Sequence, residues 1–367
     1  MLHAAGEPLR LEEVSLAGPE PGEVLVRVQA AGVCHSDLHY MTGGLTCRLP
    51  AILGHEGAGV VERTGPDVRG VAPGDAVVLM WRPRCGRCEF CRAGRPAQCA
   101  AIQVPVATGG LLDGTSRLSL GDGRPVHHFL GVSCFAEYCV VAQESVVVIP
   151  PGTPAAIAAL AGCAVVTGVG AVLNVMGSPA TPPGAGVLII GAGGVGLSAL
   201  LGARLAGADP VIVADVSRAR LDLAEALGAS HTVDSADGDL PEAVRNVLPS
   251  GVQWAFEAVG KPETLVAGLR SLRNTGTLVA IGLSRAGQTV PVPINELVQK
   301  DLRMIGSLYG SADTARLIPQ LLHWHREGRL PLGTLLGARY RLEEINEAYA
   351  RLPAQSVGRS LIMIGES

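Results

Sequence analysis

From residue 186 onward, short all-apolar segments alternate with segments of helical periodicity, and this alternation restricts the possible folds more than any other feature. The apolar segments are GVLIIGAGG (186–194), PVIVADV (210–216), QWAFEAV (253–259) and GTLVAIGL (276–283), and the helical ones are LSALLGARLAG (197–207), RLDLAEALGA (220–229) and ETLVAGLRSL (263–272). Apolar strands that alternate with helices predict parallel βαβ units, with helices on both faces of one sheet. The sequence therefore predicts an α/β, doubly wound parallel-sheet domain.

The hexamer GAGGVG (191–196) directly follows the first of these strands and directly precedes a helix. There, Gly191 permits a tight turn, Gly193 lets the backbone approach a pyrophosphate, and Gly196 allows the helix to pack closely on the strand. The N-terminus of that helix offers free N–H groups and a positive dipole end to phosphates. An ordinary glycine turn is the alternative, but the strand and helix on either side favour a dinucleotide site.

Asp215 ends the next strand, 19 residues beyond Gly196. A carboxylate in this place accepts hydrogen bonds from the adenosine ribose hydroxyls and repels a 2′-phosphate. The pattern therefore favours NAD over NADP. Arg218 and Arg220 follow closely and would soften that preference.

The first third of the chain has a different pattern, with short strands between Gly, Pro and Asp turns. Its strands are EVLVRVQAAGV (23–33), GAGVVERTG (57–65) and GDAVVLM (74–80). At the other end, an amphipathic helix (312–328) precedes a strand-and-helix tail, YRLEEINEAYARL (340–352). This order predicts a β-rich module, a doubly wound module, and a tail that returns to the first module.

Charge and hydropathy exclude several classes of function. The formal net charge of −4 gives neither a basic nucleic-acid footprint nor a polybasic membrane anchor. The segment AAIAALAGCAVVTGVGAVLNVMG (155–177) is long enough to span a bilayer, but Pro154 precedes it and four glycines interrupt it. We therefore interpret it as buried core helices. The N-terminus lacks the apolar core of a signal peptide, and the repeated C-x-x-C spacing suits metal binding in the reducing cytoplasm.

Residues 85–99 read CGRCEFCRAGRPAQC and hold four of the nine cysteines, Cys85, Cys88, Cys91 and Cys99. Four thiolates from one loop satisfy tetrahedral zinc and leave no open position for water or substrate. A closed shell of this kind predicts a structural zinc that staples a loop with little apolar material. An iron–sulfur cluster is the alternative, because similar spacings hold such clusters.

A catalytic zinc needs three protein ligands and one vacancy, so its ligands must come from elsewhere in the chain. AGVCHSDLHY (31–40) places Cys34 at a strand end, LGHEGAG (53–59) puts His55 and Glu56 in a turn, and LAGCAVVTG (160–168) carries Cys163. Each residue taken alone is more often packed than ligating. Together they supply two cysteines and one histidine, a ligand set found at catalytic zinc.

These motifs occur in an order that resembles the zinc-dependent alcohol dehydrogenases of the medium-chain dehydrogenase/reductase superfamily, over nearly the full length of the chain. The matching blocks are AGVCHSDLH, GHEGAGVV, CGRCEFC with its later cysteine, DGTSR with HHFLG, GCAVVTGVGA, GAGGVG with Asp215, and the terminal GRSLI. The resemblance implies a β-rich GroES-like catalytic domain over 1–164 and 308–367, and an NAD-binding Rossmann domain over 165–307. It implies an NAD-dependent enzyme with one catalytic and one structural zinc ion per chain.

The family pattern further implies that Cys34, His55 and Cys163 bind the catalytic zinc, with Glu56 beside it as an outer or transient ligand. The zinc would acidify the alcohol hydroxyl so that a hydride passes from the alcohol carbon to the nicotinamide. Neither the acidification of the hydroxyl nor the hydride transfer needs the four-cysteine loop.

Other roles implied by the resemblance concern the proton, the cofactor and the substrate. Ser36 would hydrogen-bond the alcohol, and His39 would pass its proton to solvent through the cofactor ribose. Trp81 matches an aromatic residue of the substrate pocket, with Phe129 and Leu130 as further candidates. The implied cofactor contacts are His35, Thr167, Gly191, Gly193, Gly194, Val195, Gly196, Asp215, Arg220 and Arg359.

Departures from related branches narrow the substrate. Glutathione-dependent formaldehyde dehydrogenases carry two carboxylates and an arginine where this chain has Gly43, Leu45 and Ile102. Polyol dehydrogenases carry Glu rather than Cys at position 163. We therefore expect an apolar primary alcohol or its aldehyde, aromatic or allylic, with the S-(hydroxymethyl)glutathione dehydrogenase activity as the alternative.

A different class of function is a non-enzymatic dinucleotide-binding protein, as lens crystallins of this superfamily are. Such chains typically lose the catalytic ligands, whereas this one keeps all three together with Ser36 and His39. The same ligands argue against a zinc-free quinone or enoyl reductase. The long segment from about 104 to 130 accompanies dimers in relatives, so a homodimer is expected. Three further cysteines, Cys47, Cys134 and Cys139, are interpreted as packed thiols.

Overall fold

The computed structural model describes residues 1–104, 108–176, 185–236, 238–352 and 357–365. The chain divides into two compact units. Unit 1 comprises Met1–Cys163, Asp313–Glu327 and Leu336–Ser367, and unit 2 comprises Ala164–Ala312 and Gly328–Leu335. The boundaries expected from sequence differ from these units at residues 164, 308–312 and 328–335, which fall in unit 2.

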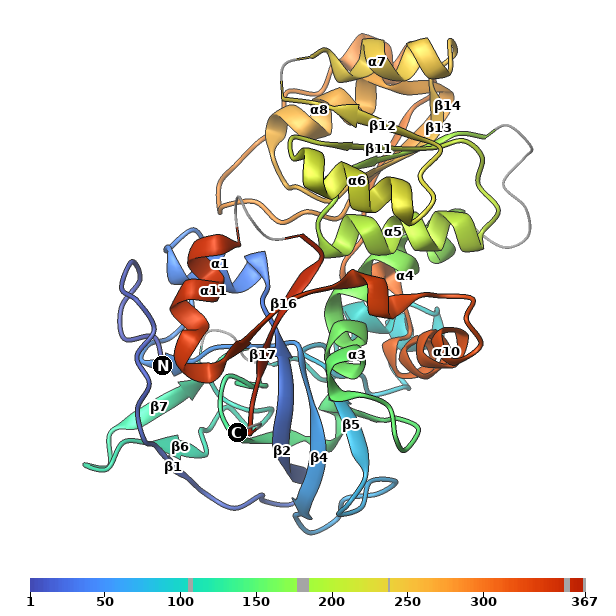
Figure 1. The fold of residues 1–367 in the computed structure, drawn as a ribbon. Helices are drawn as coiled ribbons and strands as arrows, with labels where there is room; N and C mark the ends of the chain where they lie inside the picture. The colour runs from blue at the N-terminus through green and yellow to red at the C-terminus, as the bar shows by residue number, and fades with distance from the viewer. Residues whose placement is uncertain (105–107, 177–184, 237, 353–356, 366–367) are drawn as a thin grey trace. The chain divides into compact units, whose positions relative to one another are not determined.

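In the part of unit 2 that the structure describes, six parallel strands form one sheet of order β12-β11-β10-β13-β14-β15 (Figure 1). The strands are β10 (Val187–Ile190), β11 (Val211–Asp215), β12 (His231–Asp234), β13 (Val252–Glu257), β14 (Leu272–Ala280) and β15 (Arg303–Gly306). The helices are α4 (Val166–Met176), α5 (Gly194–Leu205), α6 (Arg218–Ala226), α7 (Leu240–Val247), α8 (Pro262–Arg270) and α9 (Ile294–Gln299). The doubly wound fold is confirmed, and strand order reverses between β10 and β13, which places the topological switch point there.

Unit 1 is β-rich, with one sheet of order β16-β17-β2-β4-β5-β9, in which β8 also pairs with β2, and a second of order β1-β6-β7-β3. Its strands are β1 (Ser15–Leu16), β2 (Glu23–Gly32), β3 (Ala51–Ile52), β4 (Gly57–Thr64), β5 (Ala76–Leu79), β6 (Leu118–Ser119), β7 (Pro125–His128), β8 (Tyr138–Ala142), β9 (Val146–Val148), β16 (Leu336–Arg341) and β17 (Arg359–Met363). Its helices are α1 (His35–Met41), α2 (Glu89–Arg92), α3 (Ala155–Leu160), α10 (Thr314–Arg326) and α11 (Ile345–Arg351). Since β17 pairs antiparallel with β2, the tail does return to the first module.

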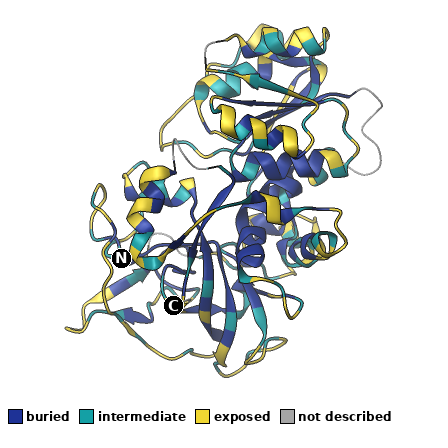
Figure 2. Ribbon diagram, in the orientation of Figure 1, coloured by how far each residue is buried: buried dark blue, intermediate teal, exposed yellow. Residues whose placement is uncertain are grey.

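The most apolar segment, Ala155–Met176, runs through α3, a π-helical turn over Ala161–Val165, and α4. It is long and apolar enough to cross a membrane, but 94% of its most apolar window is buried inside the fold. Figure 2 shows this burial along α3 and α4, which are mostly dark blue. Burial in the core accounts for the composition of this segment, as the glycines and the preceding proline predicted.

The DGTSR segment is held to the start of β2 by ion pairs around the buried Arg117 side chain. The Arg117 guanidinium donates to Glu23 at 3.0 and 2.7 Å, to Asp113 at 2.8 Å and to Glu20 at 3.0 Å. The backbone N–H of Arg117 donates to Nε2 of the buried His128 at 3.2 Å. This network joins β2 to the loop that leads into β6 and β7.

The environment of His128 predicts a loss of stability in mild acid. Burial and the nearby Arg117 guanidinium lower the pKa of His128 to about 4. A free histidine has a pKa of about 6.5, so between these values the unfolded chain takes up a proton that the folded chain does not. From this residue alone, we expect the free energy of unfolding to fall by roughly 2 kcal/mol between pH 8 and pH 5, at about 1.4 kcal/mol per pKa unit.

Urea unfolding at the two pH values, in wild type and in His128→Gln, measures this contribution. The variant should show a smaller difference between pH 8 and pH 5, whatever its stability at pH 8. An identical pH difference in the two proteins would show that His128 does not contribute.

Candidate functional site

Three segments of unit 1 bring the predicted ligands of the catalytic zinc together. Cys34 precedes α1, His55 and Glu56 precede β4, and Cys163 lies in the π-helical turn after α3. The ligand atoms of Cys34, His55 and Glu56 lie within 4.8 Å of one another, and Cys163 Sγ lies 3.7 Å from His55 Nε2. Two ligands at tetrahedral angles around zinc, with bonds of 2.0–2.3 Å, lie roughly 3.6 Å apart. The spacing of His55 and Cys163 fits a zinc ion.

The local structure at Cys163 and Cys34 serves this arrangement. A π-helical turn inserts an extra residue into a helix and is frequent at functional sites. Both cysteines are buried, and a side-chain hydrogen bond between them lowers the pKa of Cys34 and raises the pKa of Cys163. Two sulfur atoms and one imidazole nitrogen thus converge in a buried place, with a donor set that suits zinc.

A carboxylate behind His55 sets the direction of its imidazole ring. His55 Nδ1 lies 3.1 Å from Asp37 Oδ1, and both side chains are fully buried. Asp37 accepts the proton on Nδ1, so the lone pair on Nε2 is left for a metal. Asp37 also accepts the N–H of Gly54 at 3.3 Å. Sequence reasoning missed Asp37, although its place three residues after Cys34, inside the same short helix, was a usable signal.

Glu56 is held by a buried arginine. Arg359 Nε donates to Glu56 Oε2 at 2.9 Å, and Arg359 Nη2 donates to Oε1. Burial raises the pKa of Glu56, and the Arg359 charge opposes that rise. Gly32 makes room for the pair, because a Cβ there would lie 2.0 Å from Glu56 Oε2. The structure thus places Arg359 beside the proposed metal ligands, and its phosphate contact stays a prediction.

The residues predicted to move the proton lie on α1. Cys34 caps this helix, and its sulfur accepts the N–H of Ser36 at 3.4 Å. Ser36 and His39 are three positions apart and therefore share a face of the helix, as a relay requires. His35 is exposed, whereas Ser36 and His39 are half-buried.

Two of the three predicted pocket residues flank the imidazole of His55. The Trp81 ring centroid lies 6.2 Å from that of His55 at 81°, and the Phe129 centroid lies 6.0 Å from it at 63°. Leu130 follows Phe129 with a φ of 52° and is buried. The aromatic side chains that the resemblance placed near the substrate thus pack around a proposed metal ligand.

Two further side chains, which sequence reasoning missed, extend this aromatic group. The Tyr40 ring meets the Phe129 ring edge-on at 4.8 Å, and the Arg82 guanidinium carbon lies 4.9 Å from the Trp81 ring centroid. Arg82 Nε is buried and has no hydrogen-bond partner among the described residues. A cation beside an indole face is favourable, and it steadies the Trp81 ring.

The second metal group is the four-cysteine loop. The sulfur atoms of Cys85, Cys88, Cys91 and Cys99 lie within 4.8 Å of one another. Cys88 Sγ is 3.8 Å from Cys99 Sγ, and Cys85 Sγ is 4.0 Å from Cys91 Sγ, close to the roughly 3.8 Å that tetrahedral zinc imposes on two sulfur ligands. Backbone N–H groups of Cys91 and Ala100 lower the pKa of Cys88 to about 6, which favours the thiolate.

The remaining cysteines belong to neither group. Among the described residues, the only clusters able to hold a metal are the four-cysteine loop and the one around His55. Cys134 and Cys139 are buried in the core of unit 1, and Cys47 is half-buried and packs against it. Their interpretation as packed thiols agrees with this placement.

In unit 2, the glycine loop has the geometry expected for a dinucleotide. Gly191 has a φ of +94°, and a Cβ at Gly196 would lie 1.7 Å from the Gly191 carbonyl oxygen, so both positions require glycine. A Cβ at Gly193 would meet nothing within 4 Å, so the backbone there is open to a ligand. Gly194 and Val195 begin α5, whose N–H groups face that opening. Thr167 is buried in α4.

Asp215 ends β11 beside the glycine loop. Its Oδ2 accepts the N–H of Ala192 at 2.7 Å, and its Oδ1 accepts the N–H of Ser217 at 2.9 Å. Arg220 Nη1 lies 3.8 Å from Oδ1. Each carboxylate oxygen retains a lone pair for a ribose hydroxyl, so this acidic group fits NAD.

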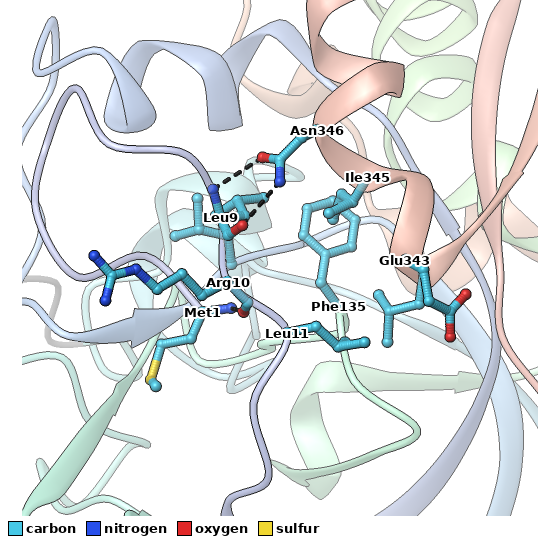
Figure 3. A pocket seen from close by; sticks show the side chains of 10 residues that line it. Met1, Leu9, Arg10, Leu11, Phe135, Glu343, Ile345 and Asn346 are labelled. Atoms are coloured by element: carbon cyan, nitrogen blue, oxygen red, sulfur yellow. Dashed lines mark hydrogen bonds between the residues drawn. The ribbon is translucent and has the colours of Figure 1, made fainter.

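A hollow of unit 1 lies elsewhere, between the N-terminal segment and α11 (Figure 3). Asn346 closes one end of it, accepting the Leu9 N–H at 2.9 Å and donating to the Leu9 carbonyl at 2.8 Å. None of the predicted site residues lines it. The two hydrogen bonds of Asn346 join the start of the chain to α11.

Comparison with known proteins adds to this geometry. Residues 20–151 match the alcohol dehydrogenase GroES-like domain, and residues 194–324 match the zinc-binding dehydrogenase domain. The chain is 38% identical over 352 residues to geraniol dehydrogenase of Castellaniella defragrans, covering 95% of this chain and 92% of the relative. It is 33% identical over 368 residues to S-(hydroxymethyl)glutathione dehydrogenase of Paracoccus denitrificans, covering 98% and 97%. Benzyl alcohol dehydrogenase of Acinetobacter calcoaceticus has a similar structure, with a TM-score of 0.91, 32% identity and coverage of 99% and 98%.

Proposed function

The chain belongs to the zinc-dependent alcohol dehydrogenases of the medium-chain dehydrogenase/reductase superfamily, and on that premise we propose that it interconverts an apolar primary alcohol, aromatic or allylic, and its aldehyde with NAD. The observation that carries this proposal is the buried convergence of Cys34, His55 and Cys163 beside the Trp81 and Phe129 rings. A protein that only binds dinucleotides has no use for such a metal site. Unit 1 is proposed to be the catalytic domain and unit 2 the dinucleotide domain.

Each side chain at the metal site has a proposed task. Cys34, His55 and Cys163 would hold the zinc ion, and Arg359 keeps Glu56 beside them. When bound, zinc supplies a Lewis acid that lowers the pKa of an alcohol hydroxyl. Three ligands leave one position open, which the closed four-cysteine loop does not.

The proton leaves along α1. The Ser36 hydroxyl would accept the proton of the alcohol while it releases its own, and His39, on the same face of the helix, would pass that proton towards solvent. His39 is half-buried and therefore stands between the site and water. Trp81 and Phe129 exclude water from the alcohol carbon, which protects the hydride.

The cofactor site follows from the glycine loop. When bound, NAD supplies the hydride acceptor. The open backbone at Gly193 and the first N–H groups of α5, at Gly194 and Val195, receive the pyrophosphate. Asp215 receives the ribose hydroxyls and excludes a 2′-phosphate, with Arg220 beside it.

The substrate class follows from the relatives and from the residues near the zinc. Geraniol is an allylic alcohol and benzyl alcohol an aromatic one, and relatives acting on each align over nearly the whole chain. S-(hydroxymethyl)glutathione dehydrogenases align equally well, but Gly43, Leu45 and Ile102 provide no charge for a glutathione conjugate. The two aromatic rings beside His55 suit a flat, uncharged tail.

A substrate panel tests this function. Benzyl alcohol, geraniol, a straight-chain alcohol and S-(hydroxymethyl)glutathione would each be assayed with NAD and with NADP. We expect kcat/KM to be highest for benzyl alcohol and geraniol with NAD. It should be at least about tenfold higher than for the glutathione adduct, and at least about tenfold higher than with NADP, because one unpaired charge weakens binding by about that factor. A preference for the glutathione adduct would support the alternative enzyme. Tight NADH binding without turnover of any alcohol would support a non-enzymatic protein.

We also propose that the enzyme is a cytoplasmic homodimer. The strand β15 is an exposed sheet edge, and Ile294 and Val298 of α9 are each 72% exposed. An unpaired edge next to apolar side chains suits pairing with a second copy. The long segment of about 104–130 agrees with a dimer, although its residues 105–107 lie outside the described residues. Sedimentation equilibrium tests the dimer, and a monomeric mass would contradict it. Cell fractionation tests the cytoplasmic location, and a membrane-bound pool would contradict it.

A further inference from the structure

Glu257 is a fully buried residue at the carboxyl end of β13, and no motif in the sequence marks it. Its Oε1 accepts three hydrogen bonds, from the N–H groups of Val259 and Gly260 at 2.9 and 2.8 Å and from the Thr264 hydroxyl at 2.8 Å. Its Oε2 is buried and has no hydrogen-bond partner among the described residues. One oxygen atom therefore holds the whole turn between β13 and α8.

The backbone of Glu257 holds a second turn. Its carbonyl oxygen accepts the N–H groups of Ile281 and Gly282, which follow β14, at 2.8 and 3.0 Å. The two turns are in contact, because a Cβ at Gly282 would lie 2.2 Å from Gly260 N, and a Cβ at Gly260 would lie 2.2 Å from Leu283 O. A single residue thus fixes both turns, one through its side chain and one through its carbonyl.

These turns lie against the glycine loop. Glu257 is in register with Ile190, the residue that precedes Gly191. A Cβ at Gly191 would lie 2.7 Å from Val259 Cγ2. Val259 and Leu283, one from each turn, are 37% and 47% exposed, so apolar side chains remain uncovered beside the loop. This edge, where β10 and β13 end, is the switch point of the sheet, and doubly wound sheets bind their ligands there.

We propose that Glu257 is a positioning residue for the dinucleotide: its carboxyl group sets the turn between β13 and α8, which borders the glycine loop, and so controls cofactor affinity without touching the cofactor. Its oxygens are enclosed by the turns, so the effect passes through Val259, Gly260 and their neighbours. The inference rests on the proposed function, since it takes NAD as the ligand.

Two substitutions distinguish the effect of the acceptor oxygen from the effect of side-chain size. Glu257→Gln keeps an oxygen for the three donors and places an amide where the other oxygen has no partner. Burial raises the pKa of Glu257, and the hydrogen bonds from Thr264, Gly260 and Val259 oppose that rise. Glu257→Leu keeps a similar size but leaves the N–H groups of Val259 and Gly260 without their acceptor, while the Thr264 hydroxyl keeps the Lys261 carbonyl at 2.9 Å.

The measurement is the Kd for NADH, by fluorescence titration of the zinc-loaded protein, together with KM for NAD and kcat. For Glu257→Leu we expect Kd and KM to rise at least about tenfold, since the N–H groups of Val259 and Gly260 lose their acceptor, while kcat at saturating NAD changes little. Glu257→Gln should stay within about twofold of wild type. Should Glu257→Leu not fold, Thr264→Val removes one donor, and we expect it to raise Kd by roughly threefold.

The matched control is Ser271→Ala at the other end of α8, where a buried serine donates its hydroxyl to the Ala267 carbonyl at 2.8 Å. It should lower the melting temperature without changing Kd. A purely structural role for Glu257 would give the same result in Glu257→Leu, and an unchanged Kd there would overturn the proposal. Equal weakening in Glu257→Gln would also overturn it. A wild-type protein that binds no NADH would overturn the proposed function itself, and the positioning role with it.

Discussion

Replacement of Cys34 by serine is expected to abolish alcohol oxidation while the protein remains folded. Cys34 supplies one of three ligands at the proposed open site, and Asp37 and Arg359 would still hold His55 and Glu56 in place. A Lewis acid contributes several kcal/mol to the transition state, so we expect kcat/KM to fall by at least about a thousandfold. Zinc measured by elemental analysis should fall from two atoms per chain to one.

Cys47→Ser is the matched control for this experiment. It makes the same chemical change at a half-buried cysteine outside both metal groups. We expect this variant to keep two zinc atoms and the activity of the wild type. A Cys34→Ser protein with full activity, or with both zinc atoms, would show that the open site is not where the chemistry occurs.

Replacement of Cys88 by serine is expected to have the opposite profile, with a large loss of stability and a modest loss of activity. The short helix α2 buries none of its residues, so the loop has few apolar contacts of its own to hold it. Zinc joins the two ends of this loop, and losing such a cross-link costs at least about 2 kcal/mol, which lowers Tm by roughly 5 °C or more. Well below Tm, kcat per folded molecule should stay within about threefold of wild type.

Arg87→Ser is the control in the same loop, because Arg87 is exposed and lies between two of the cysteines. It should keep both zinc atoms and the wild-type Tm. If Cys88→Ser instead lost activity as completely as Cys34→Ser without a change in Tm, the four-cysteine loop would have a catalytic role.

The proposed metal ligands could be singled out in the sequence because cysteine and histidine are rare residue types with metal-binding side chains. Cys34, His55 and Cys163 stand out in the sequence by residue type alone. The fold must still bring them together, since His55 and Cys163 are 108 positions apart. The strands and helices around the glycine loop were equally predictable, since their apolar periodicity is uninterrupted.

Buried carboxylates were not predictable in the same way. Asp37 and Glu257 belong to common residue types. Asp37 acts through donors from a distant segment, and Glu257 acts through the backbone conformation of the turn that follows its own strand. The edge strands β12 and β15 were not predicted from the sequence either. Both are largely exposed, and β12 reads HTVD, with little apolar character. A strand that buries neither face leaves no periodic signal.

The central claim is that the two cysteine-containing groups divide their work, with chemistry at the open one and stability at the closed one. Anomalous scattering at the zinc absorption edge, from crystals of the purified protein, tests this most directly. We expect two peaks per chain, one within about 2.0–2.3 Å of Cys34, His55 and Cys163 with a fourth position left to solvent, and one enclosed by Cys85, Cys88, Cys91 and Cys99. A single peak inside the four-cysteine loop, with none beside His55, would contradict it.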